Sequence, residues 1–310
     1  MTNTTTIPTR ERTRRPPRSR RVTALLPTNA VFQGARSPQL GGRGLTGVLR
    51  GITTTLQTSE PAALRGAAAI ALPLDLETAP TGRRPDVELF YDSIAGEFDQ
   101  IMNRYDLQRR LETVFDTFLG PHDLTGLNLL DAGCGTGWFS LWACRRGANV
   151  TAVDIGPRLL AQVRRKCGAR TRLGDVLDLE FRDGAFDVVV SSECIEHTRD
   201  PRRAVRELIR VCRPGGLAVI TSNNRAWWWL CNLANKLHLR PYEGIENWPS
   251  WRQLRRWVEE EGAEVLDMCG IHLFPFQLSW FHPILRFLDR FGRTLGPLCV
   301  NQAVLATKPC

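Results

Sequence analysis

The sequence predicts an α/β protein built on a doubly wound parallel sheet with helices on both faces, within residues 86–310. Short apolar segments alternate with segments that have the spacing of amphipathic helices, as expected of consecutive strand–helix units. Several predicted strands are continuously apolar, as in the run 188–190, which is typical of a sheet covered on both faces. A glycine-rich turn directly follows the first strand, where doubly wound sheets bind their ligands.

Each element follows from its hydrophobic pattern. Apolar residues at helical spacing predict a helix over 87–105, broken at Gly96, and a second over 107–119. The predicted strands cover residues 127–131, 149–154, 171–175, 186–191, 217–221, 264–270 and 300–307. The predicted helices between them cover residues 138–146, 157–167 and 201–212.

The first 85 residues carry all of the chain's net charge of +9. They contain 13 arginines and four acidic residues, whereas residues 86–310 contain equal numbers of basic and acidic residues. Their content of Thr, Pro, Gly and Arg predicts a disordered basic tail, because it offers little apolar surface to bury. A mitochondrial transit peptide is one alternative, and weak contact of the stretch 10–21 with anionic lipid or nucleic acid is another. The neutral main domain predicts no nucleic-acid partner.

The spacing of the cysteines and the length of the apolar runs indicate the cellular compartment of the protein. The nine cysteines are scattered without CxxC spacing, which argues against a zinc cluster or a dithiol redox centre and favours a reducing compartment. The longest apolar run near the start, residues 67–74, is too short to span a bilayer and too far along for a signal peptide. We therefore expect a cytoplasmic protein, or one of the mitochondrial matrix if the tail is a transit peptide.

The glycine turn indicates the kind of ligand. Asp131 ends the first predicted strand, and Gly133, Gly135 and Gly137 follow it at GxGxG spacing. Dinucleotide-binding turns have GxGxxG spacing, and a carboxylate here would repel a pyrophosphate but suits a cationic ligand. These features count against an NAD-dependent oxidoreductase, the rival of different chemistry. The intact turn also counts against a non-enzymatic ligand-binding or scaffold protein.

Two more acidic residues end predicted strands. Asp154 ends the second strand, where a carboxylate can accept both ribose hydroxyls, and Asp175 ends the third, within reach of an adenine amino group. Because the carboxyl ends of parallel strands meet at one edge of a sheet, we expect Asp131, Asp154 and Asp175 in one site. A tight strand–helix turn without a ligand is the alternative for the glycines alone.

Together, the runs LLDAGCGTG, VTAVDI, GDV, FDVVVSSECIEH and RPGG closely resemble the class I S-adenosylmethionine-dependent methyltransferases. The resemblance covers about residues 86–310. It implies a seven-stranded, mostly parallel sheet whose last strand runs antiparallel. The cofactor-binding residues that it implies are Asp131, Gly133, Gly135, Gly137, Asp154, Asp175, Val176 and Ser192.

The resemblance also implies which part of the cofactor each of these residues contacts. Gly133 and Gly135 would contact the amino-acid end of S-adenosylmethionine, and Asp154 would bind its ribose. Asp175 and Val176 would flank the adenine.

A cluster of titratable residues follows the fourth predicted strand. If the chain enters a helix there, Glu193, Glu196 and His197 lie at positions i, i+3 and i+4 of one face. This pattern is similar to that of the O-methyltransferases of ubiquinone biosynthesis, and the resemblance implies that the three side chains hold a divalent cation such as Mg²⁺. His197 has two other interpretations, as a general base for the acceptor hydroxyl or as an orienting side chain.

Three segments are candidates for covering the cofactor and the acceptor. Within residues 86–105, the run YDSIAGEFD resembles the lid helix of this family, with Tyr91 and Phe98 facing the cofactor. Residues 223–262 contain six of the nine tryptophans, and residues 272–297 are strongly apolar with interspersed arginines. The last segment suits a cover for an apolar acceptor or contact with a membrane surface, and core packing explains both patterns as well.

We therefore predict an enzyme that transfers a methyl group from S-adenosylmethionine to a hydroxyl of an apolar small molecule, phenolic or quinol-like. His197, with Glu193 and Glu196, would act on the acceptor. The alternatives are methylation at carbon or nitrogen, and methylation of a lipid- or glycan-linked acceptor.

Overall fold

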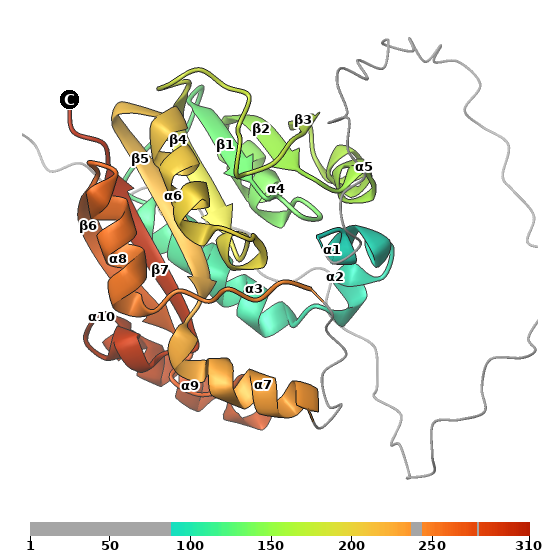
Figure 1. Ribbon diagram of the computed structural model, residues 1–310, viewed down its shortest axis with the longest axis vertical. Helices are drawn as coiled ribbons and strands as arrows, with labels where there is room; N and C mark the ends of the chain where they lie inside the picture. Colours follow the sequence, from blue (N-terminus) through green and yellow to red (C-terminus); the bar gives the residue numbers. More distant parts are fainter. Residues whose placement is uncertain (1–87, 237–243, 278) are drawn as a thin grey trace, which may run out of the picture. The chain divides into compact units, whose positions relative to one another are not determined.

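A seven-stranded sheet forms the centre of the structure, a computed structural model that describes residues 88–236, 244–277 and 279–310 (Figure 1). These residues belong to one unit, Pro73–Cys310. The predicted tail, residues 1–85, lies outside the described residues, so the expectations about it stay predictions. Among the described residues, no helix combines the length and apolarity needed to cross a bilayer.

The sheet has the predicted strands in the order β3-β2-β1-β4-β5-β7-β6. Strands β1 to β5 pair in parallel, and β7 runs antiparallel to both of its neighbours, which confirms the mostly parallel sheet. The strands are β1 (Asn128–Ala132), β2 (Asn149–Asp154), β3 (Arg170–Leu173), β4 (Phe186–Ser192), β5 (Cys212–Asn223), β6 (Glu264–Ile271) and β7 (Asn301–Thr307). The chain runs outward from β1 through β2 to β3 and then crosses to β4 on the other side of β1. The strand order therefore reverses between β1 and β4, and sheets of this kind bind ligands at the carboxyl ends of the two strands at such a point.

Helices cover both faces of the sheet (Figure 1). The α-helices are α1 (Phe90–Ser93), α2 (Phe98–Ile101), α3 (Arg104–Leu111), α4 (Trp138–Arg145), α5 (Pro157–Lys166), α6 (Pro201–Val211), α7 (Trp228–Lys236), α8 (Trp251–Glu260), α9 (His282–Leu288) and α10 (Gly292–Leu295). The helix predicted over 107–119 differs in form, because α3 passes into a π-helical stretch, Glu112–Phe118. The apolar segment 272–297 contains the short helices α9 and α10 and single 3₁₀ turns.

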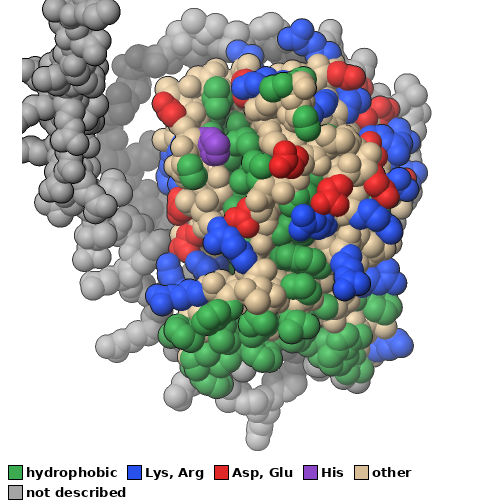
Figure 2. Space-filling model, turned by 90° about the vertical axis from the view of Figure 1, so that its left-hand side faces the viewer, with side chains coloured by type: hydrophobic (Ala, Val, Ile, Leu, Met, Phe, Trp, Pro, Cys, Tyr) green, Lys and Arg blue, Asp and Glu red, His purple; other side chains and the backbone are tan. Residues whose placement is uncertain are grey.

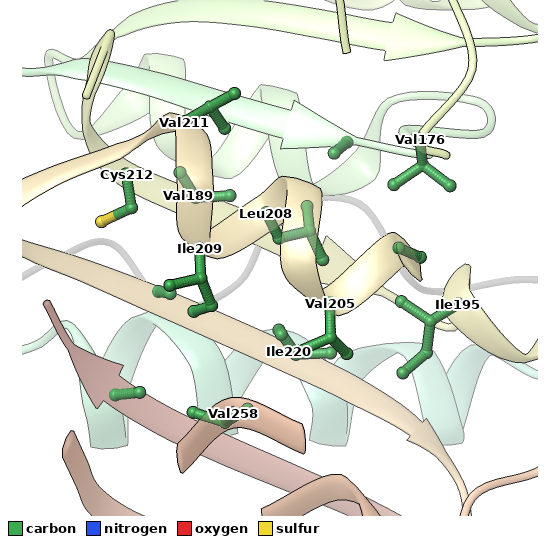
Figure 3. Packing of buried hydrophobic residues seen from close by; sticks show 14 of the residues in the cluster. Val176, Val189, Ile195, Val205, Leu208, Ile209, Val211, Cys212, Ile220 and Val258 are labelled. Carbon is green, nitrogen blue, oxygen red and sulfur yellow. The ribbon is translucent and has the colours of Figure 1, made fainter. Parts of the chain in front are cut away.

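Alternate residues of the central strands supply two separate cores. In β1, Leu130 belongs to the core under α6 and α8, and Leu129 to the core under α4 and α5. Figure 3 shows the first core, where Val205 and Leu208 of α6 lie among residues of the sheet such as Ile220. A strand buried on both faces needs apolar residues at consecutive positions, which is the pattern that the sequence shows.

Candidate active site

A cavity of about 940 Å³ lies at the carboxyl ends of β1 and β4, where the strand order reverses. Of the eight residues predicted to bind the cofactor, seven line this cavity, and Gly137 does not. The lining residues among the eight are Asp131, Gly133, Gly135, Asp154, Asp175, Val176 and Ser192. Seven of the residues selected from the sequence therefore line the same cavity in the folded protein.

The three glycines of the turn after β1 serve different purposes. All three have positive φ, which favours glycine. A Cβ on Gly133 would lie 2.1 Å from Sγ of Cys194, and a Cβ on Gly137 would lie 2.9 Å from the side chain of Val163 in α5. A Cβ on Gly135 would meet nothing within 4 Å, although the residue lines the cavity. Gly133 and Gly137 therefore permit close packing, whereas Gly135 leaves open space beside the backbone that a ligand can fill.

Asp131 is almost completely buried at the end of β1 and accepts a hydrogen bond from Oγ of Ser140 in α4. Burial raises the pKa of its carboxyl to about 7, although the bond from Ser140 opposes the shift. The nearby charge of Asp154 contributes to the same rise. A cation bound in the cavity would lower the pKa and favour the ionised form.

Asp154 ends β2 and connects two loops of the cavity. Its Oδ2 accepts a hydrogen bond from the backbone N–H of Gly135, and its Oδ1 accepts one from Gly156, each at 2.9 Å. Burial raises the pKa of Asp154 to about 6 against the effect of these two bonds. Each carboxylate oxygen can accept a further hydrogen bond. Asp154 can therefore bind the two loops and a ligand at the same time.

Asp175 and Val176 lie just beyond β3, which ends at Leu173, two residues earlier than predicted. Oδ1 of Asp175 accepts a hydrogen bond from the backbone N–H of Leu177, which fixes a short turn. Val176 is buried and lines the cavity beside it. Both residues reach the cavity from the loop rather than from the strand.

Helices α1 and α2 cover the cavity in the region predicted to form a lid. Tyr91 and Phe98 line the cavity, and their rings pack edge to face with centroids 5.3 Å apart. Oδ1 of Asp92 accepts hydrogen bonds from the backbone N–H groups of Arg158 and Leu159, so it binds the N-terminus of α5.

Asp99 provides a second attachment of the lid. It accepts hydrogen bonds from Oγ1 of Thr136, Nε1 of Trp138 and Nζ of Lys166, at 2.6 to 2.9 Å. Burial alone would raise its pKa, but these bonds and the charge of Lys166 hold the pKa below its ordinary value. Neither aspartate was singled out from the sequence, although both lie within the run YDSIAGEFD that predicted the lid.

The cluster after β4 does not have the predicted helical arrangement. Glu193 has a positive φ of 52°, and only a single 3₁₀ turn, Ile195–His197, follows it. The chain does not enter an α-helix here but turns sharply at Glu193, so Glu193, Glu196 and His197 do not share one helical face. Glu193 and His197 line the cavity, whereas Glu196 is fully buried behind it.

The two glutamates form a pair of acidic groups, of which Glu196 is fully buried and Glu193 is partly buried at the cavity wall. Oε1 of Glu193 accepts a hydrogen bond from Oγ1 of Thr221, and its Oε2 accepts one from Nδ2 of Asn301. Burial raises the pKa of Glu193 to about 8, and the neighbouring charge of Glu196 adds to the rise. Burial also raises the pKa of Glu196, although bonds from Asn223 oppose it.

His197 is turned toward the lid rather than toward the glutamates. Its Nδ1 lies 2.9 Å from the carbonyl oxygen of Ile245, and its Nε2 lies 3.2 Å from the hydroxyl of Tyr91. Because a carbonyl only accepts, Nδ1 carries the proton, and Nε2 of the neutral ring accepts from Tyr91. The rings of His197 and Tyr91 also pack edge to face.

These contacts test the predicted metal centre. A divalent cation would need Glu193, Glu196 and His197 to point at one position. Instead, both ring nitrogens of His197 contact Ile245 and Tyr91, and Glu196 lies outside the cavity lining. Within the described ranges no group of three or more His, Cys, Asp or Glu side chains is arranged to hold a metal ion. The three residues do not fit a common metal site in this conformation.

The sequence analysis did not predict a buried arginine that lines the cavity. Arg110 of α3 lines the cavity, with Nε 2.9 Å from Oδ2 of Asp106 and Nη1 3.1 Å from Oγ of Ser192. Because Thr221 donates to Glu193, Ser192 must donate to Thr221, at 2.8 Å. One directed chain of hydrogen bonds therefore runs from the guanidinium to Glu193. The sequence does contain a signal for this residue, because Arg110 is a charged residue three positions after Leu107, on the apolar side of the predicted helix.

Comparison with known proteins agrees with this geometry. The family model described as a methyltransferase domain matches residues 130–220. A crystal structure of an S-adenosylmethionine-dependent methyltransferase from Mesorhizobium loti shares the fold, with a TM-score of 0.50 and 18% identity over 64% of this chain and 98% of that chain. The match and the glycine turn place the protein in the class of methyltransferase-like α/β domains.

Curated relatives define the family more closely. A ubiquinone biosynthesis O-methyltransferase of Pseudomonas aeruginosa is 33% identical over 165 residues, which are 49% of this chain and 71% of the relative. A malonyl-[acyl-carrier protein] O-methyltransferase of Serratia marcescens is 36% identical over 133 residues, or 42% of this chain, and the chain spans about half of that relative's length, 52%. The chain belongs to the S-adenosylmethionine-dependent methyltransferases.

Proposed function

We propose that the protein transfers a methyl group from S-adenosylmethionine to a hydroxyl group of an apolar small molecule, of phenol or quinol type. The single observation that carries the proposal is that one cavity joins the glycine turn and its acids to Glu193 and His197. The first part suits a cationic nucleoside, and the second offers groups that bind and deprotonate a hydroxyl. The described lining includes apolar side chains such as Phe98, Leu107 and Phe276, which suit an apolar acceptor.

Most of the cofactor residues predicted from the sequence fit S-adenosylmethionine. When bound, it supplies an activated methyl group on a sulfonium. The open space beside Gly135 admits its amino-acid end, and the free acceptor sites on Asp154 suit the ribose hydroxyls. Asp131 adds negative charge near a bound cation. Gly137 acts through packing on Val163 instead of through contact with the cofactor.

Glu193 is the group we assign to take the proton of the acceptor hydroxyl. It faces the cavity, and its pKa of about 8 lies closer to the pKa of a phenol, about 10, than that of an ordinary carboxyl does. As the acceptor oxygen forms its bond to the methyl carbon and the carbon–sulfur bond breaks, the proton passes to the carboxylate of Glu193. The chain of hydrogen bonds from Arg110 stabilises the ionised carboxylate before it takes the proton.

His197 is better suited to positioning than to proton abstraction. Its basic Nε2 already accepts the hydroxyl hydrogen of Tyr91, so the ring links the acceptor side of the cavity to the lid. A closed lid excludes water, and methyl transfer requires an aligned nucleophile in a dry site. The interpretation of His197 as an orienting side chain therefore has the stronger geometric support.

A carboxylate is a second candidate acceptor, because Arg110 places a positive charge in the cavity. A screen with methyl-labelled S-adenosylmethionine against phenols, carboxylic acids and amines distinguishes the candidates. An O-methyl phenol ether survives alkali, whereas a methyl ester releases labelled methanol. Alkali-stable label on a phenol supports the first proposal, and label on an amine or on carbon alone would contradict both.

A further inference from the structure

The large apolar side chains on the surface are concentrated on one part of the molecule. Of the eleven that are exposed among the described residues, nine belong to α7, α9 and the segments beside them. We name this set the aromatic face: Trp228, Trp229, Leu233, Phe274, Trp280, Ile284, Phe287, Phe291 and Leu298. Figure 2 shows hydrophobic side chains gathered along the lower edge of the molecule, which is where Figure 1 places α7 and α9. The most exposed ring, Trp280, has 72% of its surface accessible.

Direct contacts make these segments one continuous surface. The ring of Trp227, just before α7, packs 6.4 Å from that of Phe274, and Phe274 packs 6.3 Å from Phe281 at the start of α9. The indole N–H of Trp227 donates to the carbonyl oxygen of Leu298. The tryptophans of residues 223–262 thus divide into two groups. Trp251 and Trp257 pack against the core around α8, and Trp248 is buried, whereas Trp228 and Trp229 are exposed.

The charges on these segments are almost all of one sign. Residues 225–236 and 279–298 contain five basic side chains and one acidic side chain, although the domain 86–310 is neutral. The acidic residue, Asp289, is buried and bonded to Arg109. The five basic residues are all exposed: Arg225, Lys236, Arg286, Arg290 and Arg293. Carboxylates at the margin contact two of them, Glu112 to Arg286 and Asp267 to Arg293.

We propose that the aromatic face docks on the surface of an anionic lipid bilayer. Tryptophan and phenylalanine bury apolar rings at the level of the head groups, and arginine binds lipid phosphate while its stem stays in apolar surroundings. The excess of positive charge on this surface complements an anionic membrane rather than a neutral one. Helix α9, with seven residues, is far too short to span a bilayer, so the contact is interfacial.

The aromatic face is connected to the wall of the cavity. Phe276 lines the cavity and lies two residues beyond Phe274, and its carbonyl oxygen accepts a hydrogen bond from Nε2 of His282, the first residue of α9. Tyr105 stacks on His282 with ring centroids 3.7 Å apart. Docking would therefore hold one wall of the cavity at the bilayer. If the proposed function is right, an apolar acceptor dissolved in lipid reaches the site there.

The test is co-sedimentation of the full chain with vesicles of phosphatidylcholine alone and of phosphatidylcholine mixed with phosphatidylglycerol. We expect the wild type to sediment with the mixed vesicles, with binding that weakens as salt rises. The double variant Trp280→Ser/Phe287→Ser should bind the mixed vesicles at least about tenfold more weakly. The double variant Arg286→Gln/Arg290→Gln should lose only the preference for anionic lipid.

Leu266→Ser is the matched control, because Leu266 is half exposed on β6 outside the aromatic face. It should bind vesicles as the wild type does. Calorimetry with S-adenosylhomocysteine confirms that each variant is folded, and it reports separately on the proposed function, which sedimentation does not test. Three results would overturn the docking proposal: no sedimentation of the wild type, undiminished binding of the aromatic double variant, or a dimer that this variant dissociates without any vesicle binding.

Discussion

The two halves of the cavity are built in different ways. The half that we assign to the cofactor, around Asp131, Gly135 and Asp154, is made by short segments at the ends of neighbouring strands. The half that we assign to the acceptor joins Arg110, Glu193 and Asn301, which come from α3, the turn after β4, and β7. The first half can be identified from local patterns in the sequence. The second depends on contacts between residues that lie about 80 to 110 positions apart.

The halves also differ in their electrostatics. Asp154 is held by backbone N–H groups, so its position follows from the path of the chain. Glu193 is held by the side chains of Thr221 and Asn301, and single substitutions can change its pKa and its orientation. We therefore expect substitutions in the cofactor half to abolish binding, and those in the acceptor half to change the rate and its pH dependence.

The largest effect should follow Gly135→Arg, which fills the open space beside the turn. We expect the affinity for S-adenosylhomocysteine, measured by calorimetry, to fall at least about 100-fold, or roughly 3 kcal/mol. Gly262→Arg is the matched control, because Gly262 also has positive φ and open space around it but lies between α8 and β6, outside the cavity lining. Equal losses in the two variants would show that backbone strain, rather than a blocked site, causes the effect.

Substitution of Glu193→Gln tests the acceptor half. We expect the rate of methyl transfer to a phenol to fall by about 10²–10³, because the variant lacks the carboxylate that we assign as the general base, while cofactor binding stays within a few-fold. In the wild type the rate should rise with pH and level off above the pKa of Glu193, about 8. The variant should lose this transition, and the exposed control Glu264→Gln should keep it. An unchanged pH profile in Glu193→Gln would show that another group takes the proton.

The attachment of the lid should have an intermediate effect. Asp99→Asn removes the charge that binds Lys166 and weakens the contacts with Thr136 and Trp138. We expect the dissociation rate of S-adenosylhomocysteine to rise several-fold, up to about tenfold, because the lid opens more readily. Stopped-flow fluorescence measures this rate, and Asp123→Asn, at an exposed loop, is the control. A dissociation rate equal to that of the wild type would show that the lid does not limit release.

The last prediction concerns the dependence of stability on pH. Asp131, Asp154 and Glu193 have pKa values of about 7, about 6 and about 8, all above their ordinary values of 3.8 and 4.5. The folded protein therefore keeps protons that the unfolded chain releases in this range. Without cofactor, the free energy of unfolding should fall as pH rises from about 4 to about 8.

Thermal unfolding across this pH range measures the slope. Asp131→Asn should make the slope shallower, because one of the three side chains no longer titrates. The exposed control Asp178→Asn should leave it unchanged. A melting temperature that rises steadily over the same range would contradict the assigned direction of these pKa shifts.

Most of the fold was predictable because its signals are local. The apolar strands gave the sheet, and the glycines gave the turn whose Gly135 borders the cavity. The turn at Glu193 was missed, since a left-handed φ at a residue other than glycine has no clear sequence signal. Arg110 was missed for another reason, because its contact with Ser192 forms only when α3 packs against the end of β4.

If the proposed function is right, the bound cofactor presents its methyl group to Glu193 within this one cavity. A crystal structure with bound S-adenosylhomocysteine would show this arrangement. We predict that the ribose contacts Asp154 and that the sulfur atom faces the side of the cavity formed by Glu193 and His197. A sulfur atom directed away from Glu193, or a ligand bound outside the turn at Gly135, would show that Glu193 does not act on the acceptor in the proposed way.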